Sequence, residues 1–108
     1  MSISNEREAM MLKKQVYKGG QRVRVWFYLP TEVKAQTAAL VGDFNGWDKT
    51  ANPMKIKKDG TFYTAITLET GKAYEFRYFL DGERWENDWQ ADAYVQSDMG
   101  VENSVVEV

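Results

Sequence analysis

The feature that most restricts the fold of this chain is an alternation of apolar and polar side chains that begins at Gln21. In the segment QRVRVWFYLP, the apolar set is Val23, Val25, Phe27 and Leu29, and the set between them is Arg22, Arg24, Trp26 and Tyr28. Successive side chains of a β-strand point to opposite faces of the sheet. The pattern therefore predicts a strand with one apolar face and one mixed aromatic face, closed by Pro30.

The same reading recurs along the rest of the chain. Further strands are predicted in TAALVGDF, PMKIKKDGTFYTAITL, KAYEFRYFLDGERW and NSVVEV. Two of these segments are hairpins joined through Asp59-Gly60 and Asp81-Gly82, because Asp-Gly favours the positive φ angles of a type I′ turn. About seven short strands at spacings of about ten residues predict an all-β fold, an immunoglobulin-like antiparallel β-sandwich. The core candidates are Val23, Val25, Phe27, Val41, Phe62, Ile66, Tyr74, Phe76, Tyr78, Val106 and Val108.

A short N-terminal helix is predicted before these strands, in NEREAMMLKKQVYK. Asn5 with Glu8 three residues later resembles a capped helix start, and Lys13 and Lys14 stand at its end, where cations suit the helix dipole. The helix should end before Gly19-Gly20. A chain of 108 residues suits one domain. We therefore expect a helix and lead-in over 1–20 and the sandwich over 21–108.

The composition excludes several kinds of chemistry. The chain has no histidine and no cysteine, so it lacks disulfides, His-ligated zinc and any Ser-His or Cys-His nucleophile. Its formal charge of -2 provides no excess positive charge for a nucleic-acid partner. We find no membrane-spanning run and no signal peptide, and we predict a cytoplasmic protein without cofactor or metal.

The acidic residues fit structural roles better than catalytic ones. Asp43, Asp48, Asp59 and Asp81 stand in predicted turns, where Asp bonds nearby backbone amides. A pair of catalytic carboxylates for glycoside hydrolysis stays an open alternative. We do not expect a complete hydrolase of this kind, since a (β/α)8 catalytic barrel takes about 250 residues. The segment DFNGWD resembles a calcium loop only in part, because Trp47 stands where an oxygen ligand is needed.

Three tryptophans are unusually placed in loops or next to turns: Trp47, Trp85 and Trp89. An indole ring outside the core either covers a core edge or stacks on a ligand. A neutral sugar is a suitable ligand, because its flat face presents C–H groups to the ring and its rim presents hydroxyls to polar side chains.

Four stretches, in this order and at this spacing, together resemble carbohydrate-binding module family 48: VGDFNGWDK, DGTF, YEFRYFLDGERW and SDMGVENSVVEV. The family includes the glycogen-binding domain of the AMP-activated protein kinase beta subunit and the N-terminal domains of isoamylases and glycogen branching enzymes. The resemblance runs from about residue 21 to 108, and it implies the same immunoglobulin-like sandwich.

The resemblance also implies a site for α-1,4-linked glucan. Its members in this sequence are Trp47, Trp85, Arg77, Met99, Val101 and Asn103. The two tryptophans correspond to rings that stack on glucose, Arg77 to a basic residue that bonds sugar hydroxyls, and the last three to a C-terminal hairpin. No catalytic residue is implied.

Several positions depart from the family pattern. Val101 lacks the hydroxyl of the expected threonine, Met99 replaces leucine, and Arg77 replaces lysine. The segment DGERW has one residue more than the expected DGxW, and a one-residue shift turns a strand side chain to the opposite face. Trp85 can therefore face the ligand, or it can point into the sandwich with Trp89 or Arg84 outside.

Two functions compete. The first is a non-catalytic module that binds glycogen or starch through tryptophan stacking. The second is a protein docking domain that associates with a glycogen- or starch-active enzyme, or with itself, without binding glucan. It would use Trp26, Tyr28 and the predicted N-terminal helix. Glucan binding requires Trp47 and Arg77 on one open surface, whereas docking leaves Trp47 masked or turned inward.

Overall fold

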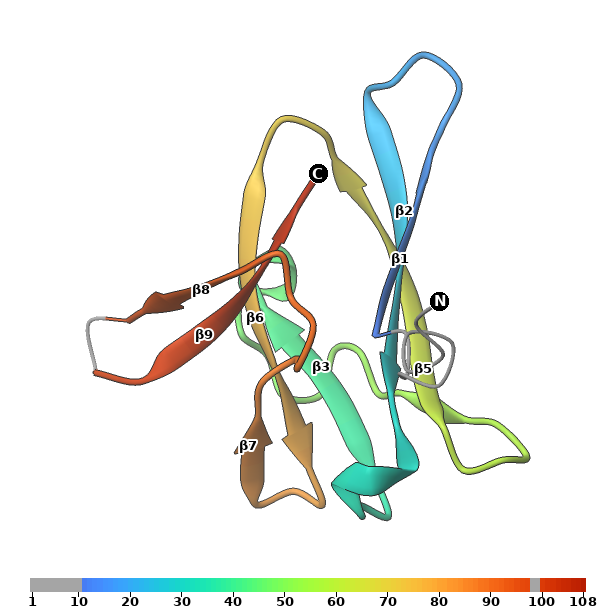
Figure 1. The fold of residues 1–108 in the computed structure, drawn as a ribbon, viewed down its shortest axis with the longest axis vertical. Coiled ribbons are helices and arrows are strands. Elements are labelled where there is room, and N and C mark those ends of the chain that lie inside the picture. The colour runs from blue at the N-terminus through green and yellow to red at the C-terminus, as the bar shows by residue number, and fades with distance from the viewer. Residues whose placement is uncertain (1–10, 98–99) are drawn as a thin grey trace, which may run out of the picture.

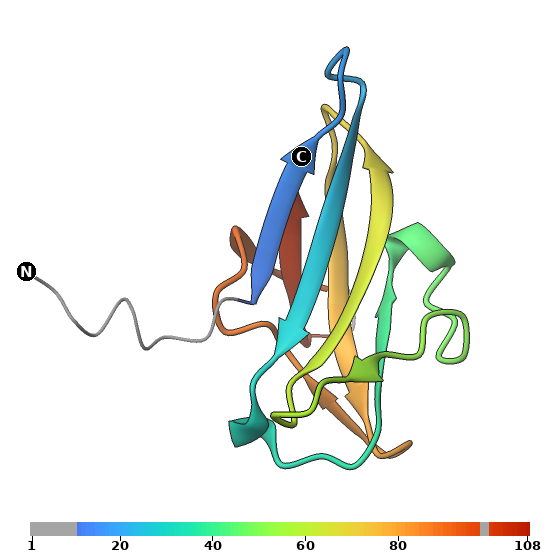
Figure 2. The same cartoon turned by 90° about the vertical axis from the view of Figure 1, so that its right-hand side faces the viewer.

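Two antiparallel sheets face each other in the computed structural model, which describes residues 11–97 and 100–108 (Figures 1 and 2). The first sheet contains, in spatial order, β1 (Leu12–Val16), β2 (Arg22–Leu29), β5 (Phe62–Glu69) and β4 (Lys55–Ile56). The second contains β3 (Ala38–Gly42), β6 (Ala73–Leu80), β9 (Glu102–Glu107) and β8 (Ala93–Gln96), with β7 (Arg84–Glu86) paired to β6. The predicted antiparallel β-sandwich is confirmed.

The described residues form nine strands rather than about seven. Two 3-10 helices, Thr31–Val33 and Asp43–Asn45, lie before and after β3. The alternation in β2 is confirmed, because its apolar set is buried and its other residues are half-buried or exposed. No helix in the described ranges is long and apolar enough to span a membrane.

The predicted N-terminal helix is wrong where the structure describes it. Residues Leu12–Val16 form strand β1, which pairs antiparallel with Val23–Phe27 of β2. Without β1, the outer edge of β2 would leave a row of backbone N–H and C=O groups unpaired. Helix propensities differ by only about 0.7 kcal/mol among ordinary residues, and tertiary pairing of this kind overrides them. Met11 strengthens this placement, because its side chain is only 1% exposed within the core. The part of the predicted helix before Met11 lies outside the described residues.

The core lies between the two sheets and confirms most of the predicted set. The buried members are Val23, Val25, Phe27, Phe62, Phe76, Tyr78 and Val106, and the partly buried members at its margin are Ile66, Tyr74 and Val108. Val41 is also fully buried, but its register partner is Arg77, so it lies on the outer face of the second sheet rather than between the sheets. Its burial therefore indicates that other side chains cover this part of the outer face.

The two Asp-Gly turns differ. Asp81 and Gly82 both have positive φ angles, 55° and 67°, and the Glu83 amide donates to the Leu80 carbonyl, as the predicted type I′ turn requires. At the other turn only Gly60 has a positive φ, 92°, so the type I′ prediction is wrong there.

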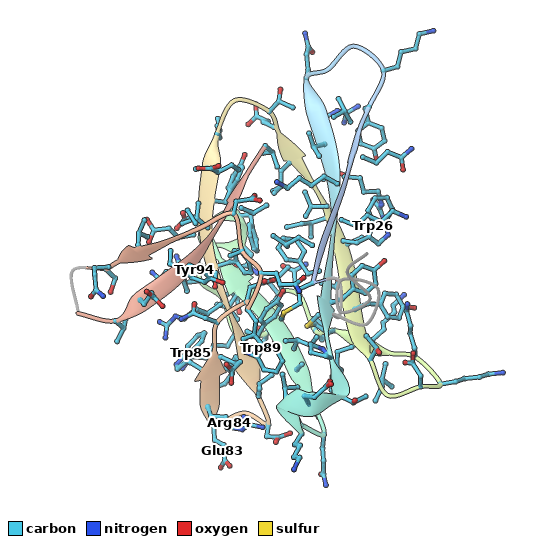
Figure 3. All side chains as sticks on the ribbon, viewed as in Figure 1. Trp26, Glu83, Arg84, Trp85, Trp89 and Tyr94 are labelled. Atoms are coloured by element: carbon cyan, nitrogen blue, oxygen red, sulfur yellow. The ribbon has the colours of Figure 1, made fainter. Side chains whose placement is uncertain are left out.

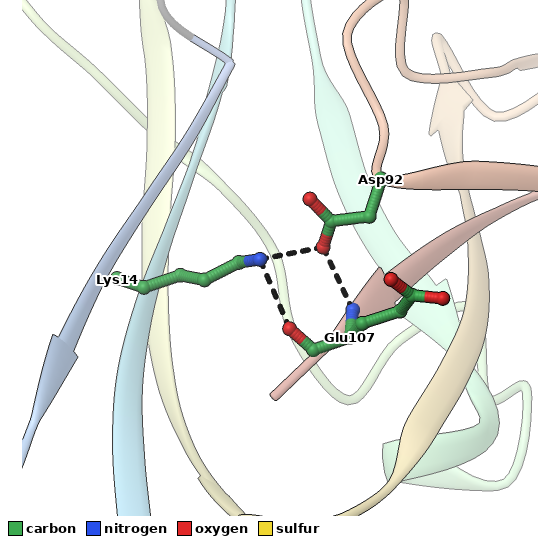
Figure 4. A network of polar contacts seen from close by, with 3 residues as sticks. All are labelled: Lys14, Asp92 and Glu107. Carbon is green, nitrogen blue, oxygen red and sulfur yellow. Dashed lines mark hydrogen bonds and ion pairs between the residues drawn. The ribbon is translucent and has the colours of Figure 1, made fainter.

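Lys14 of β1 connects the two sheets by contacting Asp92 and Glu107 at the β8–β9 hairpin (Figure 4). Its ammonium group lies 2.6 Å from Asp92 Oδ2 and donates to the Glu107 carbonyl at 2.9 Å. The same Asp92 oxygen accepts from the Glu107 amide at 2.7 Å. Strand β1 is therefore tied to β2 by its backbone and to the β8–β9 hairpin by one side chain.

Candidate functional site

The candidate site lies on the outer face of the second sheet, centred on β6. Phe76, Tyr78 and Leu80 of this strand are buried in the core, so the residues between them point outward. The register pairs Phe79 with Trp85 of β7. Directly opposite residues of an antiparallel pair lie on the same face. Arg77, Phe79 and Trp85 therefore share one surface.

The loop after β3 carries Trp47 to this surface. A Cβ atom at Gly42 would lie 2.5 Å from the Glu75 carbonyl oxygen, so only glycine allows the chain to turn this close to β6. Asn45 then holds the turn: its Oδ1 accepts from the Gly42 amide at 3.1 Å, and its Nδ2 donates to the Leu40 carbonyl at 3.0 Å. These contacts explain the glycine and the asparagine of the GDFN segment before the tryptophan.

Asp43 fixes the indole ring of Trp47. Asp43 Oδ1 accepts from Trp47 Nε1 at 2.9 Å, and Asp43 Oδ2 accepts from the Glu75 amide at 2.8 Å. The Trp47 amide donates to the Gly42 carbonyl at 2.9 Å. One carboxylate therefore joins the ring to the backbone of β6, although Trp47 itself has a φ of 59°.

Five side chains form what we call the aromatic–cation cluster: Trp47, Lys49, Arg77, Phe79 and Trp85. The Arg77 guanidinium carbon lies 4.5 Å from the Trp85 ring centroid and 5.7 Å from that of Trp47. The two indole centroids are 6.4 Å apart, with an angle of 60° between the rings. Lys49 Nζ lies 4.9 Å from the centroid of Phe79, which in turn lies 4.6 Å from Trp85. The cluster also explains the burial of Val41, the register partner of Arg77 on the same face.

The orientation of Trp85 follows from the length of its turn. Residues 81–83 form a three-residue connection, so Arg84 pairs with Leu80 and Trp85 pairs with Phe79. The extra residue of DGERW is thus taken up by the turn, and Trp85 faces the cluster rather than the interior. Arg84 instead donates to the Val33 carbonyl at 2.7 Å.

Trp89 lies apart from these rings and is 47% exposed. Its indole nitrogen donates to Glu86 at 3.0 Å, and its backbone amide contacts the sulfur of Met11 at 3.2 Å. Figure 3 shows Trp85 and Trp89 beside β7. The structure therefore assigns Trp85, and not Trp89, to the same surface as Trp47.

Asn103 is buried beside the cluster. Ser104 of β9 is the register partner of Phe76 of β6, and Asn103 precedes Ser104. In this antiparallel pair, Asn103 therefore lies across from Arg77. Asn103 Nδ2 donates to Glu75 Oε1 at 3.0 Å. Two buried polar atoms at this place, Arg77 Nε and Asn103 Oδ1, have no hydrogen-bond partner among the described residues.

Val101, a further predicted member of the site, is not part of the cluster. Val101 lies in the β8–β9 connection and is 41% exposed. Met99 lies outside the described residues, so its predicted role stays a prediction.

The electrostatic character of the site is mixed. Burial lowers the pKa of the Arg77 guanidinium, since desolvation disfavours its charged form. The carboxylate of Asp43 accepts from Trp47 Nε1 and that of Glu75 from Asn103 Nδ2, so the surface holds acceptors beside the donors of Arg77 and Lys49. Within the described residues, no three His, Cys, Asp or Glu side chains gather in a way that could hold a metal ion.

Four residues of this surface were not among the site residues predicted from the sequence: Asp43, Lys49, Glu75 and Phe79. A signal for Phe79 and Glu75 was present, because each stands two residues from Arg77 in a period-two segment and must share its face. Lys49 and Asp43 gave no such signal, since their positions depend on the loop conformation.

The family profile of carbohydrate-binding module 48, described as the isoamylase N-terminal domain, matches residues 11–95. A 1,4-alpha-glucan branching enzyme of Aquifex aeolicus (strain VF5) is 35% identical over 68 residues, which cover 60% of this chain and 10% of that enzyme. A second 1,4-alpha-glucan branching enzyme, from Butyrivibrio fibrisolvens, is 28% identical over 69 residues, or 64% of this chain and 11% of that enzyme. The matched region thus spans about a tenth of the length of these relatives.

Proposed function

The chain belongs to carbohydrate-binding module family 48, and from this premise we propose that it is a non-catalytic module that binds α-1,4-linked glucan, such as glycogen or starch. The observation that carries the proposal is the placement of Trp47, Trp85 and Arg77 on one face of the second sheet. Indole rings suit the C–H face of a sugar, and the guanidinium beside them can donate to its hydroxyls.

Trp47 is the main stacking residue in this proposal. Trp85 has Phe79 at 4.6 Å and Arg77 at 4.5 Å, so neighbouring groups already contact its ring. Trp47 is half-buried, and its nearest ring neighbour, Trp85, meets it edge-on at 60°. Two rings inclined in this way fit a ligand whose surface curves, as an α-1,4-linked glucan does.

Hydrogen bonding at the site supports the same ligand. A buried polar atom without a partner costs about 1–3 kcal/mol, and Arg77 Nε and Asn103 Oδ1 are a donor and an acceptor of this kind. A sugar hydroxyl can accept from the first and donate to the second. Both atoms are covered, so the Arg77 side chain has to shift when the sugar binds.

The affinity should be modest. Two stacking rings and a few hydrogen bonds must offset the entropy lost on binding, which gives a Kd between about 1 μM and about 1 mM. Several linked copies of the module would raise the apparent strength on a polymer.

Replacement of Trp47 by alanine tests the proposal. We expect Trp47→Ala to fold but to bind β-cyclodextrin at least about tenfold more weakly, a loss of about 1.4 kcal/mol or more. Trp89→Ala is the matched control, because it removes an exposed indole outside the aromatic–cation cluster. Unchanged affinity in folded Trp47→Ala would refute stacking at this ring, and unfolding of the variant would assign the ring to the core.

A further inference from the structure

The first sheet carries a second distinctive surface, on the opposite side of the sandwich from the proposed glucan site. We call it the basic aromatic face. Its cations are Lys13, Arg22, Arg24, Lys55 and Lys57, and its rings are Trp26, Tyr28 and Tyr63. The register places Lys13 opposite Trp26, and Tyr63 opposite both Tyr28 and Lys55. Figure 3 shows Trp26 beside β2, across the molecule from Trp85.

The charge of this face is opposite to that of the rest of the chain. Glu69 is the one acidic residue in strands β1, β2, β4 and β5, and it pairs with Lys72 at 3.1 Å. These four strands hold five cations, Lys13, Lys14, Arg22, Arg24 and Lys55, against this one carboxylate. Their formal charge is therefore +4, whereas the whole chain carries -2. The remaining residues therefore carry -6, so the positive charge is concentrated on one sheet.

The aromatic rings of the face are already covered by its cations. Lys13 Nζ and the Arg24 guanidinium lie 5.1 and 5.6 Å from the Trp26 centroid. Lys57 Nζ lies 4.9 Å from the Tyr28 ring and 5.8 Å from the Tyr63 ring. These contacts hold the cations in a flat array and reduce the ring surface open to a nucleic-acid base or a sugar.

A lipid surface also fits poorly. All three rings are half-buried. Tyr17, just after β1, is 37% exposed, but the Arg22 guanidinium carbon lies 5.5 Å from its ring centroid. The described part of this face therefore offers little apolar surface to a membrane. What it presents is guanidinium and ammonium groups around tryptophan and tyrosine. Arginine forks bind carboxylates in a bidentate manner, and Trp, Tyr and Arg are the residues that contribute most at protein interfaces.

We propose that the basic aromatic face docks an acidic polypeptide segment of a protein partner, with carboxylates bound by Arg22, Arg24 and the neighbouring lysines. The glucan site would stay open, because it lies on the other sheet. The module would then hold glucan and an acidic protein at the same time. This inference rests on the charge and geometry of the first sheet and does not depend on glucan binding.

Poly-L-glutamate is a suitable probe for the whole chain. We expect it to shift the Trp26 indole resonance and to bind less tightly as salt rises from about 0.01 M to about 1 M, where the Debye length falls from about 30 to about 3 Å. Arg24→Glu should weaken the interaction at least about tenfold. Lys34→Glu makes the same charge change at an exposed lysine outside the four strands and should weaken it less than about twofold.

Further measurements keep the inference testable. Arg24→Gln serves if Arg24→Glu does not fold, and the affinity of either variant for maltoheptaose should equal that of the wild type. Failure of maltoheptaose binding alone would count against the proposed function and not against this face. The inference would be overturned by no binding of poly-L-glutamate, by equal losses in the Arg24 and Lys34 variants, or by tighter binding of oligodeoxythymidylate or phosphatidylserine vesicles.

Discussion

Trp47 has a backbone conformation that its side chain does not favour. Its φ of 59° lies in the left-handed region, which costs a residue other than glycine about 1–2 kcal/mol. The Trp47–Gly42 backbone bond and the Asp43–Trp47 side-chain bond offset this cost. Such strain, held in place by several contacts, is a feature of functional sites, and we infer that here it presents the indole.

Asp43 is therefore expected to position the ring. Asp43→Ala removes both bonds of the carboxylate and frees Trp47 to rotate, and ordering one such side chain costs about 0.5–1.5 kcal/mol on binding. We predict a loss of maltoheptaose affinity of about two- to tenfold. In NMR spectra, the chemical shift of the Trp47 indole proton should be averaged over several ring orientations, because the ring is no longer fixed.

Asp43→Asn separates positioning from general damage. Its Oδ1 can still accept from Trp47 Nε1, while the Glu75 amide loses its charged partner. This variant should retain more affinity than Asp43→Ala. Equal affinity of both variants and the wild type would show that the ring needs no such support.

Sequence alone located Trp47 and Arg77 but not the residues that hold them. Both positions follow from the family resemblance, Arg77 as the basic residue in the strand before the Asp81-Gly82 turn and Trp47 from the motif around it. Asp43 was interpreted only as a turn residue, because its bond to the Glu75 amide joins segments 32 residues apart. Contacts of this kind depend on loop conformation, which periodicity does not determine.

At the scale of elements, β1 changes the picture of the N-terminal region. Local signals favoured a helix, whereas the structure pairs Leu12–Val16 with β2. The backbone ladder is a tertiary effect that propensity does not contain. Residues 21–108 as the limits of the module stay a prediction, and we infer from β1 and from the family match at 11–95 that the module begins earlier.

Lys14 should couple β1 to the β8–β9 hairpin. Lys14→Met keeps much of the aliphatic stem but removes the ion pair with Asp92 and the bond to the Glu107 carbonyl. We predict a loss in unfolding free energy of about 1 kcal/mol, the upper range for a partly exposed pair. Urea unfolding of Lys14→Met, Asp92→Asn and the double variant measures the coupling, and strictly additive losses would show that the pair contributes nothing.

The orientation of Trp85 depends on the pairing of β6 with β7. Sequence left two faces open for it, because DGERW has one residue more than the family pattern. The three-residue connection 81–83 decides between them by setting the pairs Leu80–Arg84 and Phe79–Trp85. Turn length therefore determined which tryptophan joined the aromatic–cation cluster.

At the scale of the whole molecule, stability in acid depends on carboxylates whose pKa values are shifted in opposite directions. Bonds from the Thr37 and Gln36 amides lower the pKa of Asp81 from its ordinary 3.8. Its stabilising effect is therefore complete above pH 3.8 and is lost as the pH falls through the lowered value. Burial raises the pKa of Asp88, so the penalty of its charged form appears as the pH rises.

A comparison of Asp81→Asn with the wild type isolates the first of these effects. Asparagine keeps the acceptor oxygen and tolerates the φ of 55° but removes the charge. The variant should melt at a lower temperature than the wild type at neutral pH, and the difference should shrink below pH 3.8. A difference in melting temperature that does not change with pH would exclude this role for the Asp81 charge.

The two sheets give the molecule two unlike outer faces. The second sheet carries the aromatic–cation cluster, and the first carries the basic aromatic face. The two proposals together describe an adaptor, which would hold glucan on one side and an acidic protein on the other. Most of the sandwich could be predicted from periodicity, but this division required the register, which assigns each side chain to a face.

Glucan binding at the aromatic–cation cluster is best tested by an NMR titration of the wild-type protein with maltoheptaose. We predict saturable shifts at Trp47, Trp85, Arg77 and Asn103, with a Kd between about 1 μM and about 1 mM, and unchanged resonances at Trp26 and Tyr28. No shift at about 10 mM ligand, or shifts confined to the basic aromatic face, would contradict it.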